Sequence, residues 1–431
     1  MKRPYQIEER KAIQRFRSHL TSDPGSIQLI LPLADIAERL RNGVDHMLFE
    51  AELQLLQMIM EDEVSWLTGR RYKRHDGRDM ARWGAVGGSV ILHGQKQPLQ
   101  RPRIRGSHGD EKLGSYELFR REEEMQRRVW SRVMRGLTMR GYDPAIRERD
   151  RAFGLSKSCI SDRFVLASKE QVQTLLNRDL SKLKVCALMV DGVEYCGEHF
   201  IVALGVNEIG AKTILGFHQG ATENQQICDQ LLHDLAGRGL NFKHSFIAVI
   251  DGGRALRASI TKHYGERVLV QRCQLHKRRN ITDHFADHQK KYWDKKLANA
   301  YDVLNYQDAK RALNQIHREL MDVNPSAARS LEEGLDETLT VHRLGVPAEL
   351  RRILRTTNLI ESAFSRVETV CRNVKRWRDG NQRERWIGSA LVFVEQKFRR
   401  INGCHAMPKL LGILRSYAGE SGKTSTDERG L

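Results

Sequence analysis

The sequence predicts an α/β fold in which a mixed five-stranded sheet is split by an all-helical insertion and preceded by a mainly helical region. Between residues 184 and 283, apolar segments of strand length alternate with helical patterns. Residues 284–345 carry only helical periodicity, and so does most of the chain before residue 184. Residues 346–405 are expected to complete the sheet domain and contain a strongly basic helical block at 357–403, and residues 406–431 are expected to form a C-terminal tail.

The first 115 residues combine helices with an arginine-rich segment. The stretch 49–67 is amphipathic, and helical spacing also relates four earlier apolar residues: Leu33, Ile36, Leu40 and Val44. Residues 68–115 change to short strands and turns and begin with a dense run of arginines. Two interpretations remain for this run: a basic arm that lies along phosphates, or a solvated loop.

Residues 116–183 return to helical periodicity and contain a pattern typical of a helix-turn-helix. One helix is expected to end at Gly154, and Ser156 is placed to cap a second helix that runs through Ile160 and Phe164. This segment either contacts DNA or is an ordinary helical hairpin.

The sheet region begins with three consecutive strand segments. Its expected strands are residues 184–195, 199–208, 212–220, 244–253 and 267–277. Helical segments at 224–239 and 254–265 separate the last three of them. Three strands, a helix, a strand, a helix and a strand are the order of a ribonuclease-H-like sheet.

The amino-acid composition indicates which class of partner the protein binds. Lysine and arginine number 72 against 54 aspartates and glutamates, which gives a net charge of +18 and favours a polyanion, most commonly nucleic acid. No apolar run approaches the roughly 20 residues that span a bilayer, so no membrane partner is expected. The seven scattered cysteines do not resemble a disulfide framework. We therefore expect a protein of the reducing cytoplasm, associated with the nucleoid.

Two aspartates end apolar strand segments in the same way. Asp191 follows Ala-Leu-Met-Val and precedes a glycine, and Asp251 follows Ile-Ala-Val-Ile and precedes two glycines. If the first and fourth strands are neighbours, these carboxylates lie together at the carboxyl ends of the strands, where open α/β sheets bind ligands. Adjacent carboxylates repel each other unless a cation lies between them, and oxygen ligands favour Mg²⁺ or Mn²⁺. The alternative for each aspartate alone is a turn residue that caps the next helix.

A third carboxylate is expected from the basic helical block. Two ions about 3.5–4 Å apart would hold the attacking and leaving oxygens of a phosphoryl displacement, and they need a further ligand. Glu361 lies in the first turn of an expected helix. Asn358 and Glu361 have a spacing close to that of a capping box, so spacing alone fits a helix cap equally well.

Five segments resemble a known family: MVDGVEY, ALGVNEIGAKTILGFHQGATEN, VIDGGRAL, VQRCQLHKRRNI and RTTNLIESAFSRV. In this order, over roughly residues 184–403, they look like the Mutator-type transposases of bacterial insertion sequences. The resemblance implies a ribonuclease-H-like DDE catalytic domain with an all-helical insertion before the glutamate, which fits the 110-residue interval from Asp251 to Glu361. It implies that Asp191, Asp251 and Glu361 are catalytic and bind two ions of Mg²⁺ or Mn²⁺.

The activity implied by this resemblance is DNA transposition. The protein would bind terminal inverted repeats, hydrolyse the phosphodiester at the element ends and transfer the 3′-hydroxyl to target DNA. Because two ends must meet, a homodimer or higher oligomer on double-stranded DNA is expected. Residues 1–115 would bind DNA ends or dimerise, and residues 116–183 would bind DNA. The alternatives are a ribonuclease-H-like nuclease or resolvase, and a domesticated, non-catalytic DNA-binding protein.

Cys273 and His276 match the family's C-x-x-H motif. A C-x-x-H pair is half of a zinc site by spacing, and Cys196 and His199 form a second such pair. The second pair is not part of the family pattern, so we expect no structural zinc. Cys273 and His276 either orient the active site or contact DNA, and simple packing is the alternative.

Basic residues near these motifs are candidates for DNA contact. Trp293 could stack on an unpaired base, or it could pack inside the helical insertion. A solvated helix face is the alternative for the basic residues after Glu361. The full set of candidate DNA-binding residues is Lys277, Arg278, Arg279, Trp293, Arg366, Arg372, Lys375 and Arg376.

Overall fold

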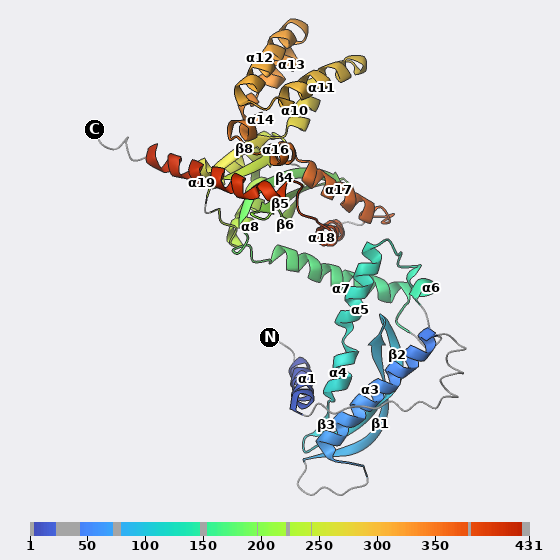
Figure 1. Ribbon diagram of the computed structural model, residues 1–431. Coiled ribbons are helices and arrows are strands. Elements are labelled where there is room, and N and C mark those ends of the chain that lie inside the picture. Colours follow the sequence, from blue (N-terminus) through green and yellow to red (C-terminus); the bar gives the residue numbers. More distant parts are fainter. Residues whose placement is uncertain are drawn as a thin grey trace. The chain divides into compact units, whose positions relative to one another are not determined.

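The computed structural model describes residues 4–22, 44–71, 79–146, 153–195, 197–220, 225–242, 244–377 and 381–424 (Figure 1). The chain divides into two compact units, Met1–Ala167 and Ser168–Leu431, and each is described by itself. Of the predicted helical stretch from Leu33 to Val44, only Val44 lies within the described residues.

The first unit contains a three-stranded antiparallel sheet that one long helix covers. Helix α1 spans Pro4–Ser22, α3 spans Val44–Thr68, and the strands are β1 (Met80–Leu92), β2 (Gln95–Gly106) and β3 (Gly109–Glu111). Helix α3 packs on β1 and β2 through a core that includes Leu56, Met60, Val64, Val90 and Ile104.

The described part of the region before residue 184 is mainly helical, as predicted, but its sheet corrects the prediction of short strands. Strands β1 and β2 are 13 and 12 residues long. Their two-residue turn, His93–Gly94, has positive φ at both residues, as type I′ hairpins require. Glycines at 84, 87 and 88 weaken the strand signal of β1 in the sequence, whereas long-range pairing with β2 and cover by α3 determine the fold.

The predicted helix-turn-helix is described in part. Helices α4 (Gly114–Arg120), α5 (Glu122–Met134) and α6 (Tyr142–Ile146) precede α7 (Lys157–Leu176). The hydroxyl of Ser156 accepts a hydrogen bond from the amide of Cys159 at 3.4 Å, so the predicted cap of α7 is confirmed. The expected helix before Gly154 falls mostly on residues outside the described ranges, so DNA contact by this segment stays a prediction.

The second unit is built on a mixed five-stranded sheet, which confirms the predicted strands and their number. The strands are β4 (Val185–Tyr195), β5 (Glu198–Asn207), β6 (Lys212–Gly220), β7 (Phe246–Ile250) and β8 (Val268–Arg272), in the order β6-β5-β4-β7-β8. Strands β4, β5 and β6 pair antiparallel, whereas β7 and β8 run parallel to β4. The first and fourth strands of the sheet region are therefore neighbours, as predicted.

Helices cover both faces of this sheet (Figure 1). Helices α8 (Gln225–Gly237) and α9 (Arg254–Tyr264) share one core with Leu188 and Val190 of β4. Helices α17 (Asn358–Cys371) and α18 (Gln382–Glu395) pack against β4 and β6 respectively. Because side chains alternate along a strand, Met189 and Asp191 point away from α8 and α9, to the face that α17 covers.

Between β8 and α17 the described chain is helical. The helices are α10 (Gln274–Thr282), α11 (Asp287–Asp302), α12 (Tyr306–Val323), α13 (Pro325–Glu332), α14 (Leu335–Thr338), α15 (Thr340–Arg343) and α16 (Ala348–Leu354). Residues from Ile281 to Leu339 form a separate apolar core. Strand β8 is shorter than the predicted 267–277, because Cys273 caps α10. Short 3₁₀ turns lie at Gly265–Arg267 and Cys404–Ala406, and the expected C-terminal tail contains helix α19 (Met407–Thr424).

Candidate active site

Asp191 and Asp251 are neighbours, just beyond the last paired residues of two adjacent inner strands of the sheet. Strands β4 and β7 are parallel, and Val190 and Ile250 are their last paired residues. Asp191 and Asp251 are each the next residue along the chain. Strand β4 continues past Asp191 to Tyr195, which agrees with the expected strand 184–195. In its antiparallel pairing with β5, Asp191 faces Val202.

The loop after β7 has a conformation that only glycine adopts easily. Gly252 has φ 107°, and a Cβ atom there would lie 2.9 Å from Nε of Arg272. The Arg272 guanidinium donates to the carbonyl of Gly252 at 2.5 Å, and the amide of Gly253 donates to Oδ1 of Asp251 at 2.8 Å. The loop therefore fixes the orientation of the Asp251 carboxylate.

Glu361 comes to the same place from the first turn of α17. Thr357, not Asn358, occupies the N-cap position, and no side chain caps the helix. Oε1 of Glu361 instead accepts a hydrogen bond of 2.7 Å from the Thr357 hydroxyl. The capping-box alternative for Asn358 and Glu361 is therefore wrong.

The three carboxylates form one electrostatic group. Asp191 is 6% exposed, and its burial raises its pKa to about 7, with further increases from the charges of Asp251 and Glu361. The neighbouring His276 acts in the opposite direction and lowers this pKa. A buried carboxylate that faces two others is costly to ionise without a cation. The donor set, three carboxylates from three elements, fits the hard oxygen ligands that Mg²⁺ and Mn²⁺ bind.

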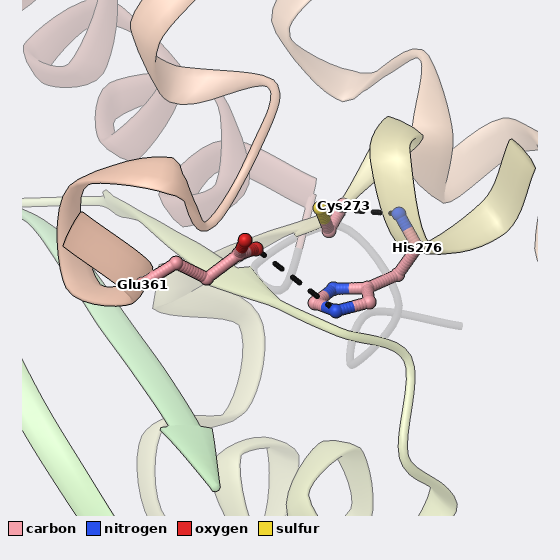
Figure 2. A group of neighbouring side chains, drawn as sticks. All are labelled: Cys273, His276 and Glu361. Atoms are coloured by element: carbon pink, nitrogen blue, oxygen red, sulfur yellow. Dashed lines mark hydrogen bonds and ion pairs between the residues drawn. The ribbon is translucent and has the colours of Figure 1, made fainter. Parts of the chain in front are cut away.

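Cys273 and His276 lie beside Glu361, as Figure 2 shows. Nε2 of His276 is 3.9 Å from Oε1 of Glu361, and the amide of His276 donates to the Cys273 sulfur at 3.5 Å. The hydrogen bond to Cys273 and the charges of Asp191 and Glu361 raise the pKa of His276 to about 9. Potential ligand atoms of Cys273, His276 and Glu361 lie within 4.8 Å of one another. Of the second C-x-x-H pair, Cys196 and His199, the cysteine lies outside the described residues.

The basic residues that follow the C-x-x-H motif divide into buried and exposed groups. Lys277 is buried, and its ammonium donates to the carbonyls of Ser330 and Glu333 at 2.7 Å each. Arg278 makes a bidentate pair with Asp294 at 2.6 and 2.8 Å, whereas Arg279 is exposed. Lys277 thus stabilises the end of α13, and of this run Arg279 is the residue most open to a partner.

Trp293 is 6% exposed and stacks on Phe285, with ring centroids 5.3 Å apart, inside the core of the helical segment. Its neighbour Tyr292 is 60% exposed. The candidates on and after α17 are all exposed: Arg366, Arg372, Lys375 and Arg376. Arg366 on α17 and the three basic residues that follow the helix are therefore open to a partner.

Sequence reasoning missed two residues of the site, Arg272 and Thr357. Arg272 ends the apolar strand β8 and is 5% exposed, and an arginine at the end of a buried strand was the signal that could have found it. Thr357 is fully buried, and its hydroxyl contacts three site residues: Cys273, His276 and Glu361. No spacing rule would have singled it out.

In the part of the chain that the structure describes, no helix is long and apolar enough to cross a membrane.

Comparison with known proteins assigns the family. The family model described as "Transposase, Mutator family" matches residues 27–400. The transposase for insertion sequence element IST2 of Acidithiobacillus ferrooxidans is 30% identical over 228 residues, which are 52% of this chain and 74% of that protein. The transposase for insertion sequence element IS905 of Lactococcus lactis subsp. lactis is 24% identical over 293 residues, 66% of this chain and 72% of that protein. The chain therefore belongs to the Mutator family of insertion-sequence transposases.

Proposed function

We propose that Asp191, Asp251 and Glu361 form the DDE catalytic centre of this transposase and bind two divalent cations, Mg²⁺ or Mn²⁺. The observation that carries the proposal is the parallel pairing of β4 with β7, which brings Asp191 and Asp251 next to each other. Burial and the charges of Asp251 and Glu361 raise the pKa of Asp191, which supports a shared site. The sheet order β6-β5-β4-β7-β8 supports a ribonuclease-H-like core formed by residues 184–283 and 346–405. Residues 284–345 are then an all-helical insertion with its own apolar core.

The chemistry proposed is hydrolysis of the phosphodiester at the element ends, followed by attack of the freed 3′-hydroxyl on target DNA. Two bound cations would activate the attacking oxygen and neutralise charge on the leaving oxygen. Asp191 and Asp251 hold their carboxylates on adjacent strands of a rigid sheet, and Glu361 closes the site from a helix. His276, which is held close to Glu361, is positioned to orient that carboxylate.

The proposed partner is double-stranded DNA, and the protein binds both the terminal inverted repeats of the element and the target DNA. Exposed cations near the site would bind its phosphates: Arg279, Arg366, Arg372, Lys375 and Arg376. Residues 1–115 and 116–183 are proposed to bind the element ends or to dimerise. Strand transfer needs two ends in one complex, so the working form is a homodimer or higher oligomer on DNA, acting in the cytoplasm at the nucleoid.

The decisive experiment is incubation of the protein with its element's own ends and Mg²⁺, followed by mapping of nicks and joined products. Asp191→Asn, Asp251→Asn and Glu361→Gln should each abolish cleavage and retain DNA binding. Nicking without joining would favour a nuclease or resolvase. Undiminished activity of all three variants would refute the assigned centre, and absence of any cleavage by the unmodified protein would favour a domesticated, non-catalytic DNA-binding protein.

A further inference from the structure

Thr357 lies where the C-x-x-H motif meets the helix that carries Glu361. It is the N-cap residue of α17 and is fully buried. Unlike a typical N-cap threonine, it does not use its side chain to cap the helix. The hydroxyl is therefore available for other contacts, and it makes them with the site.

The contacts of Thr357 join three residues of the candidate active site. Its hydroxyl is 2.7 Å from Oε1 of Glu361, and 3.4 Å from both the Cys273 sulfur and Nδ1 of His276. Its backbone amide donates to the same sulfur at 3.4 Å. The hydroxyl has one proton, and the shortest contact, to Glu361, is the one that takes it.

The Glu361 side chain needs such a partner. It is 29% exposed and has three rotatable bonds, and His276 at 3.9 Å attracts it without a hydrogen bond, so without the hydroxyl it would sample several rotamers. The Thr357 hydroxyl lies one helical turn earlier and fixes Oε1. Because a hydrogen bond to one oxygen leaves the other free, this contact orients the carboxylate without blocking a cation.

We infer that Thr357 is a positioning residue that holds Glu361 in the orientation that binds a divalent cation. The Cys273 sulfur, which accepts from the Thr357 amide, holds Thr357 in place. This inference rests on the proposed role of Glu361 as a metal ligand. Thr357 acts through its contact with Glu361 and is not itself assigned as a ligand.

The neighbouring Thr356 provides a matched control. It has the same side chain, is also buried at 9% exposure, and its hydroxyl has no hydrogen-bond partner among the described residues. Thr356→Val and Thr357→Val therefore remove the same hydroxyl one residue apart, and only the second removes a contact with Glu361.

The test measures Mn²⁺ binding to the full-length protein by the electron paramagnetic resonance signal of free Mn²⁺, together with the thermal unfolding midpoint and the rate of DNA-end cleavage. Removal of an outer partner of a metal ligand typically weakens binding about 10- to 100-fold. We expect this loss and slower cleavage in Thr357→Val. Thr357→Ser, which keeps the hydroxyl, should restore both, and Thr356→Val should match the unmodified protein.

Two results would overturn the inference. The first is an unchanged Mn²⁺ affinity of Thr357→Val together with a reduced Mn²⁺ affinity of Glu361→Gln. This result would support Glu361 as a ligand and reject the role of Thr357. The second is equal impairment of Thr357→Ser and Thr357→Val, which would indicate packing rather than the hydroxyl. Unchanged Mn²⁺ affinity in Glu361→Gln would instead refute the proposed function together with the inference. Should Thr357→Val fail to fold, Thr357→Ala carries the same comparison.

Discussion

The guanidinium of Arg272 donates a hydrogen bond of 2.5 Å to the carbonyl of Gly252, one residue after Asp251. The same group donates to the carbonyl of Glu333 at 2.8 Å and lies 3.5 Å from the carboxylate of Glu337. The buried side chain of Arg272 thus connects the loop after β7 with residues 333–337, at the junction of α13 and α14. The conformation of the Asp251 loop and the packing of the helical segment depend on each other.

Arg272→Ala should lower the free energy of unfolding by about 1–3 kcal/mol, because it leaves the carbonyl of Gly252 without its partner. The carbonyl of Glu333 and the carboxylate of Glu337 keep Lys277 and Arg257. Arg272→Lys should recover only part of this, since an ammonium lacks the planar fork that reaches two carbonyls. Chemical denaturation measures both. The control is Arg254→Ala: the side chain of Arg254 is 90% exposed, and its ion pair with Glu333 should contribute less than about 1 kcal/mol. Equal effects at the two arginines would contradict the role of Arg272.

Gly252→Ala should both destabilise the protein and slow DNA cleavage. The positive φ of 107° is strained for alanine, and the new Cβ would lie 2.9 Å from the Arg272 side chain. Displacement of that side chain would move the loop that orients Asp251. The matched control, Gly237→Ala, adds a methyl group with no neighbour within 4 Å at the end of α8. If both variants cleave DNA at the rate of the unmodified protein, the loop conformation is not needed for activity.

Asp191→Asn should abolish the stabilisation of the folded protein by divalent cations. Mn²⁺ at a hundredfold excess over its dissociation constant should raise the free energy of unfolding of the unmodified protein by about 2.7 kcal/mol. The variant should gain almost none of this. Without metal it should be at least as stable as the unmodified protein, because burial and two nearby carboxylates disfavour the Asp191 charge. Thermal unfolding with and without Mn²⁺ checks both statements, and full stabilisation of the variant would argue against Asp191 as a ligand.

His342 should make stability depend on pH below neutrality. Burial, with the charge of Arg351, lowers its pKa to about 4 from 6.5, and the ring contacts the Tyr301 carbonyl at 3.0 Å. Between pH 6.5 and 4 the unfolded chain takes up a proton that the folded protein refuses, so stability is lost as the pH falls through this range, by about 3 kcal/mol at most.

The measurement for His342 is the free energy of unfolding at pH 7 and at pH 4.5. His342→Gln should reduce the difference between the two values, since glutamine does not titrate. His405, which is exposed, serves as the control, and His405→Gln should leave the difference unchanged. A His342→Gln curve parallel to that of the unmodified protein would show that this ring does not cause the pH dependence.

Trp293→Ala should cost about 3–5 kcal/mol of stability, because the ring is 6% exposed and stacks on Phe285. Tyr292→Ala should cost less than about 0.5 kcal/mol, since that ring is exposed. Trp293→Phe should keep most of the stability. Cleavage of DNA ends by Trp293→Phe at the normal rate would assign the residue to packing, and a selective loss of cleavage would restore the predicted contact with an unpaired base.

The sheet strands could be predicted because each is a continuous apolar run that ends at glycine or polar residues. The same apolar runs predict the pairing of Asp191 with Asp251, because their strands β4 and β7 are neighbours. The β1–β2 hairpin was underestimated, because glycines weaken its local pattern and its stability comes from partners distant in sequence.

The basic run after Cys273 illustrates what charge alone leaves undetermined. In the sequence, Lys277 and Arg278 look like phosphate-binding residues as much as Arg279 does. In the structure, Lys277 binds carbonyls of α13 and its loop, and Arg278 pairs with Asp294. Those partners lie 16 to 56 residues away in the chain, so no local pattern could identify them.

The interval between Asp251 and Glu361 also has a consequence for the newly synthesised chain. A ribosome adds about 5–20 residues per second, so 110 residues take about 5–20 s. During that time the two aspartates have emerged and the glutamate has not. If Asp191, Asp251 and Glu361 form the catalytic centre as proposed, that centre is incomplete in the nascent polypeptide until the whole helical segment has been translated. A truncated product that ends within that segment would therefore lack the third carboxylate and could not cleave DNA through this centre.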